Sequence, residues 1–411
     1  MYQKTILGNG VRVLTEKIPY FHSVSMGIWV NVGSRDEQSE ERGITHFIEH
    51  MLFKGTEKRS ARDIAKELDA VGGFVNAFTS KENVCFHAKV LHPHLPLVVD
   101  VLTDIFLNSV FAPVEIAREQ QVIVQEIRMI EDTPDEYVHI LFQEMFWDGN
   151  PLGLPIYGTV EALENVNREL VLRYVSRMFQ PERIVVAAAG NLDHQRFLDL
   201  VAPTLETLNH PEKPLGRQTP EVHHRIQLIP KDLEQVHLCM GMRGPSQTDE
   251  SRFLCHLLNV VLGNSMSSRL FQEIRESRGL AYSIYSFVNS HEDTGLFGIY
   301  AGVAPENVQE TLDIIRQQLT ILCKEAIPDA ELNAAKEYLK GSMYLNAEST
   351  DSRMNRLAKN EFLFGRYIPF EEVERKIDQV TSASVQKWFE QVYQPSQVAL
   401  TLFGPVQENP G

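Results

Sequence analysis

Two stretches of this chain repeat one another at a fixed separation, and this repeat strongly constrains how the chain can fold. Residues 179–181 (Phe-Gln-Pro) precede an apolar run that stops at Gly190, and residues 393–395 (Tyr-Gln-Pro) precede one that stops at Gly404. The offset is 214 residues at both the Gln-Pro pair and the glycine, and a helix-like segment precedes each copy. Any two amphipathic helices look alike, but the shared offset favours a duplication.

The repeat predicts two domains in the 411-residue chain, at 1–208 and 221–411. The segment between them, 209–220, is rich in proline and polar residues and is expected to be a linker. Strands and helices do not alternate as strict βαβ units, so we expect an α+β fold in which each domain is a mainly antiparallel sheet packed with helices. Helices are expected at 43–53, 61–70, 95–108, 113–131, 136–147 and 167–178, and strands at 11–14, 24–32, 74–78 and 84–90.

Composition argues against several classes of protein. The net charge of −16 would repel phosphates, so nucleic acid is not expected as a partner. The longest obvious apolar run, 184–189, is too short to span a bilayer, and the N-terminal residues lack the apolar core of a signal peptide, so we expect a cytoplasmic protein without a membrane partner. No C-x-x-C pair exists, which disfavours a cysteine zinc site or redox motif. The four cysteines are scattered and are expected to be buried apolar residues: Cys85, Cys239, Cys255 and Cys323.

One five-residue segment, 46–50, contains residue types that can bind a metal ion. His46, Glu49 and His50 lie in a stretch without proline or glycine that is typical of a helix, where positions i, i+3 and i+4 share a face. Two imidazoles one turn apart can hold Zn²⁺, and a glutamate beside them can take a proton from the metal-bound water. The order H-x-x-E-H is that of the inverzincins. The alternative is a helix with one polar face and two histidines that bind no metal.

A zinc ion held by two histidines needs at least one more protein ligand. The expected helix at 113–131 offers Glu119 and Glu126, seven residues apart on one helical face, with apolar residues between them. A carboxylate in such surroundings is costly unless it is paired or binds a metal. The alternative is a solvated charged face.

The motif-bearing segments resemble the pitrilysin family, nearest the short-chain branch that includes the β subunit of mitochondrial processing peptidase and related bacterial peptidases. The resemblance lies in 43–56 and in 119–127, which matches the family's pattern E-x-x-V-I-x-x-E-I at a distance of 76 residues from His50 to Glu126. It implies one zinc per chain with these protein ligands: His46, His50 and Glu126. It also implies that Glu49 is the general base on the zinc-bound water and that Glu119 is a supporting acidic residue near the metal.

In the second half, Arg275 and Tyr282 resemble the family's arginine and tyrosine pair, which contacts the substrate backbone or the oxyanion. In short-chain members two subunits enclose a chamber, so the resemblance implies a homodimer in which the partner subunit supplies this pair. The alternative is a surface arginine and a half-buried tyrosine. The second half is expected to bind no zinc, because the residues that align near the ligand positions cannot rebuild the site: Cys255, Leu258 and Asn259.

The resemblance implies a zinc endopeptidase for short or unfolded peptides, which add to an edge strand containing Asn76, Ala77 and Phe78. The alternative for this segment is a plain hairpin. Two other functions are open: a non-catalytic core or scaffold subunit, and the catalytic subunit of a heterodimeric processing peptidase. The intact set of motif residues favours an enzyme.

Overall fold

The computed structural model describes residues 1–209 and 216–406, and these residues form two compact units. The first unit combines Met1–Arg128, Leu154–Arg217 and Asn346–Tyr367, and the second combines Met129–Gly153, Gln218–Leu345 and the residues after Tyr367. Each unit therefore includes a short segment from the opposite half of the chain. The domain limits at 1–208 and 221–411 stay a prediction, and residues 210–215 of the predicted linker lie outside the described residues.

The first unit is built on a six-stranded sheet in the order β1-β2-β6-β3-β5-β4. Neighbouring strands are antiparallel except for the parallel pair β2 and β6. The strands are β1 (Tyr2–Ile6), β2 (Arg12–Lys17), β3 (Ser23–Val30), β4 (Phe74–Thr79), β5 (Val84–Leu91) and β6 (Ile184–Gly190). The helices of this part of the chain are α1 (Ile44–Leu52), α2 (Ala61–Asp69), α3 (Leu95–Asn108), α4 (Pro113–Glu131), α6 (Val160–Glu164), α7 (Arg168–Met178), α8 (His194–Leu205) and α12 (Thr350–Phe364).

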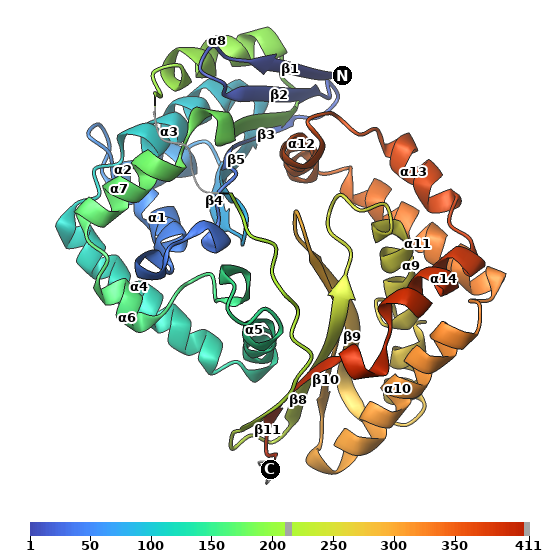
Figure 1. Cartoon of the computed structure of the whole chain (residues 1–411). Helices are drawn as coiled ribbons and strands as arrows, with labels where there is room; N and C mark the ends of the chain where they lie inside the picture. The colour runs from blue at the N-terminus through green and yellow to red at the C-terminus, as the bar shows by residue number, and fades with distance from the viewer. Residues whose placement is uncertain (210–215, 407–411) are drawn as a thin grey trace. The chain divides into compact units, whose positions relative to one another are not determined.

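Helix α12 comes from the second half of the chain but packs on the first sheet, against β6, β3 and β2 (Figure 1). Its residues Met354 and Leu357 share a buried cluster with Val185 and Ala187 of β6. Every residue of β6 is buried, which explains why its sequence is a continuous apolar run rather than an alternating one.

The second unit repeats this plan with a five-stranded sheet in the order β7-β11-β8-β10-β9. Its one parallel pair is β7 and β11, the counterpart of β2 and β6. The strands are β7 (Ile226–Pro230), β8 (Val236–Gly244), β9 (Ala281–Ser290), β10 (Gly295–Val303) and β11 (Ala399–Gly404). The helices are α5 (Pro134–Phe146), α9 (Arg252–Leu262), α10 (Val308–Lys324), α11 (Asp329–Asn346), α13 (Phe370–Asp378) and α14 (Ser382–Val392). Helix α5, from the first half, packs on β8 and β11 as α12 packs on the first sheet.

The two repeated glycines have the same backbone role. Gly190 and Gly404 have φ angles of +131° and +141°, a conformation that residues with a side chain rarely adopt. Each is the last residue of a strand, β6 or β11. A Cβ atom at either would lie within 2.5 Å of a backbone carbonyl oxygen, that of Ser23 or of Gln235. The prediction of an α+β fold with two duplicated, mainly antiparallel sheets is confirmed.

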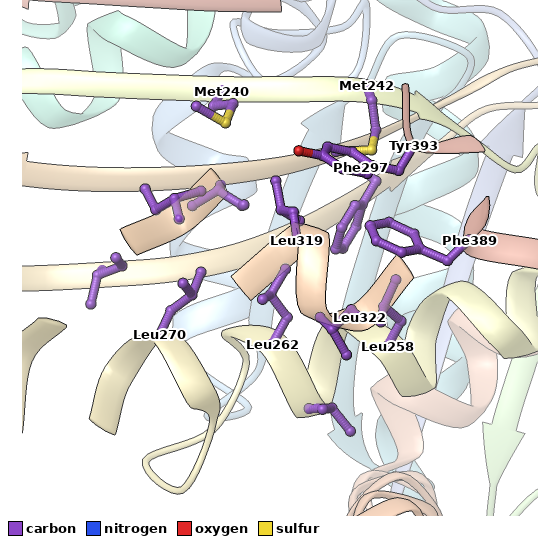
Figure 2. Packing of buried hydrophobic residues seen from close by; sticks show 14 of the residues in the cluster. Met240, Met242, Leu258, Leu262, Leu270, Phe297, Leu319, Leu322, Phe389 and Tyr393 are labelled. Carbon is purple, nitrogen blue, oxygen red and sulfur yellow. The ribbon is translucent and has the colours of Figure 1, made fainter. Parts of the chain in front are cut away.

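Helices of the second unit cover its sheet through a large apolar cluster. Leu258 and Leu262 of α9 lie in this cluster with Leu319 of α10, Phe389 of α14 and Phe297 of β10 (Figure 2). Within the described residues, no helix is long and apolar enough to cross a lipid bilayer.

Candidate metal centre

Helix α1 carries the H-x-x-E-H segment and lies in the first unit. It begins after Gly43, whose φ of +85° and contact with the backbone of Tyr157 leave no room for a side chain. The apolar residues of α1, such as Phe47 and Met51, are buried in the unit. The face that carries the two histidines and Glu49 is only partly buried.

Helix α4 brings Glu126 to the two histidines. The Nε2 atom of His46 lies 3.7 Å from Oε1 of Glu126, and Nε2 of His50 lies 3.8 Å from Oε2 of the same carboxylate. Among the described residues, these three are the group of histidine, cysteine and acidic side chains that offers ligand atoms within 4.8 Å of one another. Two atoms that each bind one zinc at about 2.1 Å are at most about 4.2 Å apart, so both measured separations are compatible with a shared ion.

The protonation of His46 also suits a metal ligand. Burial, followed by the charge of His50, lowers the pKa of His46 to about 4. The imidazole is therefore neutral at pH 7, which is the form that binds metals. Two imidazole nitrogens and one carboxylate are a ligand set found in catalytic zinc sites that keep a position open for water.

Glu119 lies seven residues, about two helical turns, before Glu126 on α4, and it contacts His50. Its Oε1 atom is 2.9 Å from Nδ1 of His50, and its Oε2 atom is 2.6 Å from Nζ of Lys54. The carboxylate of Glu119 is buried, so both partners compensate for the loss of water around it. The sequence analysis assigned no role to Lys54, which lies in the turn after α1.

Glu49 is held by the last residue of strand β4. The hydroxyl of Thr79 donates a hydrogen bond to Oε2 of Glu49 over 2.6 Å. Burial raises the pKa of Glu49 above its ordinary value, while the hydrogen bond from Thr79 and the charge of His50 oppose this rise. No local signal in the sequence links Thr79 to Glu49, because the two residues belong to different elements.

A buried glutamate upstream of α1 caps the helix. The two carboxylate oxygens of Glu37 accept hydrogen bonds from the backbone N–H of Gly43, over 2.8 Å, and of Thr45, over 2.9 Å. Both N–H groups belong to the start of α1, where helix N–H groups lack partners within the helix. Burial raises the pKa of Glu37 to about 8, although both capping bonds act to lower it. The sequence interpretation missed Glu37 as well.

Strand β4 is an edge strand, and Asn76, Ala77 and Phe78 lie in its middle. Among the described strands its one neighbour is β5, so its other side offers backbone groups to a partner. The backbone N–H of Ala77 donates to Oδ1 of Asn76 over 2.9 Å. A peptide that pairs with this edge at Ala77 must displace the Asn76 side chain.

Arg275 and Tyr282 lie together in the second unit. The guanidinium carbon of Arg275 is 4.9 Å from the centre of the Tyr282 ring and 4.8 Å from that of Phe271, and Tyr282 is 80% exposed. Arg275 also pairs through Nε with Oε1 of Glu276 over 3.9 Å, so two aromatic rings and one carboxylate surround its guanidinium group. Arg275 lies in the π-helix Phe271–Glu276, a rare form that often occurs at functional sites, and Tyr282 follows it in β9.

Helix α9 is the counterpart of α1, and among the described residues the group of possible metal ligands includes none of its side chains. Its Cys255, Leu258 and Asn259 are all buried, and Leu258 is part of the apolar cluster of the second unit (Figure 2). Helix α1 thus has a partly exposed polar face, whereas these residues of α9 are buried, although each helix lies beside a similar sheet.

Comparison with known proteins agrees with this site. Residues 12–160 match the family described as "Insulinase (Peptidase family M16)", and residues 165–339 match "Peptidase M16 inactive domain". An uncharacterized zinc protease of Streptomyces coelicolor is 40% identical and aligns with 99% of this chain and 90% of its own length. The uncharacterized zinc protease YmxG of Bacillus subtilis is also 40% identical, over 98% of each chain.

Solved structures share the fold. A protease from Helicobacter pylori superimposes with a TM-score of 0.91 at 21% identity, covering 98% of this chain and 99% of that one. A structure described as a peptidase M16 inactive domain from Pseudomonas fluorescens gives 0.92 at 18% identity, covering 100% of both chains. At such identities the likeness shows the fold alone.

Proposed function

The chain belongs to peptidase family M16, the pitrilysin family, and on this premise we propose that it is a zinc-dependent endopeptidase that hydrolyses short or unfolded peptides. The observation that carries the proposal is the convergence of the Nε2 atoms of His46 and His50 on the carboxylate of Glu126. The relatives named zinc proteases support zinc as the metal. We expect one zinc ion per chain.

A zinc ion held by His46, His50 and Glu126 would supply Lewis-acid chemistry, polarising the scissile carbonyl and making water more acidic. Glu49 lies one helical turn from His46 and next to His50, so its carboxylate is placed to accept a proton from the attacking water and to pass it to the leaving amine. Thr79 fixes the Glu49 carboxylate at Oε2, which leaves Oε1 for the proton. Glu119 acts on the ligand His50 and does not contact the substrate.

The edge strand β4 is our candidate for substrate binding. A peptide in extended conformation would add to β4 at Asn76, Ala77 and Phe78 through backbone hydrogen bonds. Thr79 ends the same strand and touches Glu49, so a peptide paired with β4 would run toward the proton acceptor. Recognition of the backbone rather than of side chains predicts broad specificity.

The second unit would supply donors for the developing negative charge on the substrate. Arg275 and the exposed hydroxyl of Tyr282 are two such donors, and we propose that they act at a zinc site. We also propose a homodimer that encloses a chamber, in which the partner subunit contributes this pair. A cytoplasmic location is a further part of the proposal. A scaffold subunit would not need the complete ligand set with Glu49, so this set favours catalysis.

Cleavage of a peptide library by the purified chain, mapped by mass spectrometry, tests the proposal. We expect cleavage within unstructured peptides, its loss on treatment with a chelator and its return on addition of Zn²⁺. The matched control adds Zn²⁺ to chelated Glu49→Gln protein, which should bind the metal but stay inactive. Cleavage that survives complete zinc removal would contradict the proposal.

A further inference from the structure

Lys54 connects the end of α1 to the buried carboxylate behind the metal ligands. The helix ends at Leu52, and the backbone N–H of Lys54 still donates to the carbonyl of Met51 over 3.0 Å. This bond spans three residues, so Lys54 lies in the turn that directly follows the last residue of the helix. Its Nζ atom lies 2.6 Å from Oε2 of Glu119, which is on a different helix.

Glu119 divides its two oxygens between Lys54 and His50. Oε2 contacts the ammonium group, and Oε1 lies 2.9 Å from Nδ1 of His50. A carboxylate is an acceptor only, so His50 carries its proton on Nδ1 in this arrangement. Its Nε2 atom then has a free lone pair, and this atom faces Glu126. By contrast, Nδ1 of His46 is buried without a hydrogen-bond partner among the described residues.

Charge supports the same assignment. Glu49, Glu119 and Glu126 bring three carboxylates to one small region, and within the described residues Lys54 is the lysine that forms an ion pair with one of them. The two charges of a zinc ion and the single charge of Lys54 would balance those three carboxylates. Without Lys54, the buried carboxylate of Glu119 would lose its strongest fixed partner.

We propose that Lys54 is a positioning residue that fixes the Glu119 carboxylate and, through it, the ring orientation and tautomer of the zinc ligand His50. The inference rests on the proposed zinc site. Groups behind a metal ligand typically change metal affinity about 10- to 100-fold when they are removed. A purely structural role, in which Lys54 only ties α1 to α4, would lower the stability of the metal-free chain without changing the zinc affinity of the folded protein.

The first test measures zinc affinity on the full chain by competition with a chromogenic chelator. Lys54→Met removes the charge and keeps most of the side-chain length, and we expect it to weaken zinc binding about 10- to 100-fold. The melting temperature of the metal-free protein should also fall, because the buried Glu119 carboxylate loses its cation. Lys54→Arg should retain most of the affinity because it keeps the charge, and Lys58→Met, at an exposed position of the same loop, is the matched control.

The second test is a double-mutant cycle with Glu119→Gln. If Lys54 acts through Glu119, Lys54→Met should cost less than about twofold in zinc affinity once Glu119 is already replaced. Equal losses in both backgrounds, or unchanged affinity in Lys54→Met, would overturn the inference while leaving the zinc site itself intact. A wild-type chain that binds no zinc would overturn the proposed function and this inference together. If Lys54→Met does not fold, Lys54→Gln in the same cycle decides the question.

Discussion

Helices α1 and α9 are counterparts in two repeated units, and they differ in what covers one face. In α1 the two histidines and Glu49 are partly exposed beside a carboxylate of α4, and the rest of the helix is buried. In α9 the last six residues, Leu257–Leu262, are all buried. The same position in the repeated fold can therefore hold either a polar site or an apolar contact, and the side chains of the helix determine which one forms.

The largest expected effect concerns metal binding, which we expect for α1 and not for α9. His50→Ala removes a proposed ligand of α1, so zinc binding and peptide cleavage should both be abolished. Cys255→Ala removes a side chain that aligns near a ligand position in α9, and it should leave both unchanged. Zinc per chain, measured by atomic emission, and cleavage of a fluorogenic peptide check this. A His50→Ala chain that keeps a full zinc equivalent would mean that the metal binds elsewhere.

A second prediction separates chemistry from metal binding within α1. Glu49→Gln keeps the size of the side chain but cannot accept a proton, so kcat should fall about 10³-fold. Zinc content should stay as in the wild type, because Glu49 is not a proposed ligand. Glu57→Gln, an exposed change in the following loop, is the control and should have no effect. Retained turnover in Glu49→Gln would remove Glu49 as the base.

A third prediction asks whether the second unit completes the site of the first. Arg275→Ala should lower kcat/KM about 10²-fold without loss of zinc, because it removes a charged donor proposed to act in the transition state. The control is Arg278→Ala, three residues later, which removes a partly exposed ion pair with Glu310.

Mixing inactive variants extends this test to the oligomer. Glu49→Gln chains mixed with Arg275→Ala chains should recover part of the activity if one site draws on two subunits. Absence of recovery, when mixed dimers have been verified, would assign both residues to one chain.

The smallest expected effect concerns how each helix begins. Glu37 accepts two N–H hydrogen bonds at the start of α1, whereas Ser251 at the start of α9 makes no side-chain capping bond. Glu37→Gln replaces one acceptor oxygen with a donor, and should lower the free energy of unfolding by about 1–3 kcal/mol. Ser251→Ala should change it by less than about 0.5 kcal/mol. Urea denaturation of the metal-free chain measures both, and equal effects would contradict the capping role.

Local structure in the first half was largely predictable. The helix predicted at 113–131 is α4 (Pro113–Glu131), and the helix predicted at 95–108 is α3 (Leu95–Asn108). Strands predicted at 74–78 and 84–90 match β4 and β5 to within a residue. These elements were readable because their apolar residues recur with the period of a helix or a strand. Strand β1 (Tyr2–Ile6) was missed, since its short and mostly polar sequence carries no such signal.

The chain's sequence by itself determined the repeat, the elements and the shared face of His46, Glu49 and His50, because these depend on spacing along the chain. The family resemblance already points to Glu126, and the tertiary structure places its carboxylate opposite the imidazoles. Only the tertiary structure decided three other contacts around that face: Thr79 on Glu49, Lys54 on Glu119 and Glu37 on the start of α1. It also decided that α12 packs on the first sheet and α5 on the second. The physical reason is that these contacts join elements distant in sequence, and packing rather than local periodicity selects them.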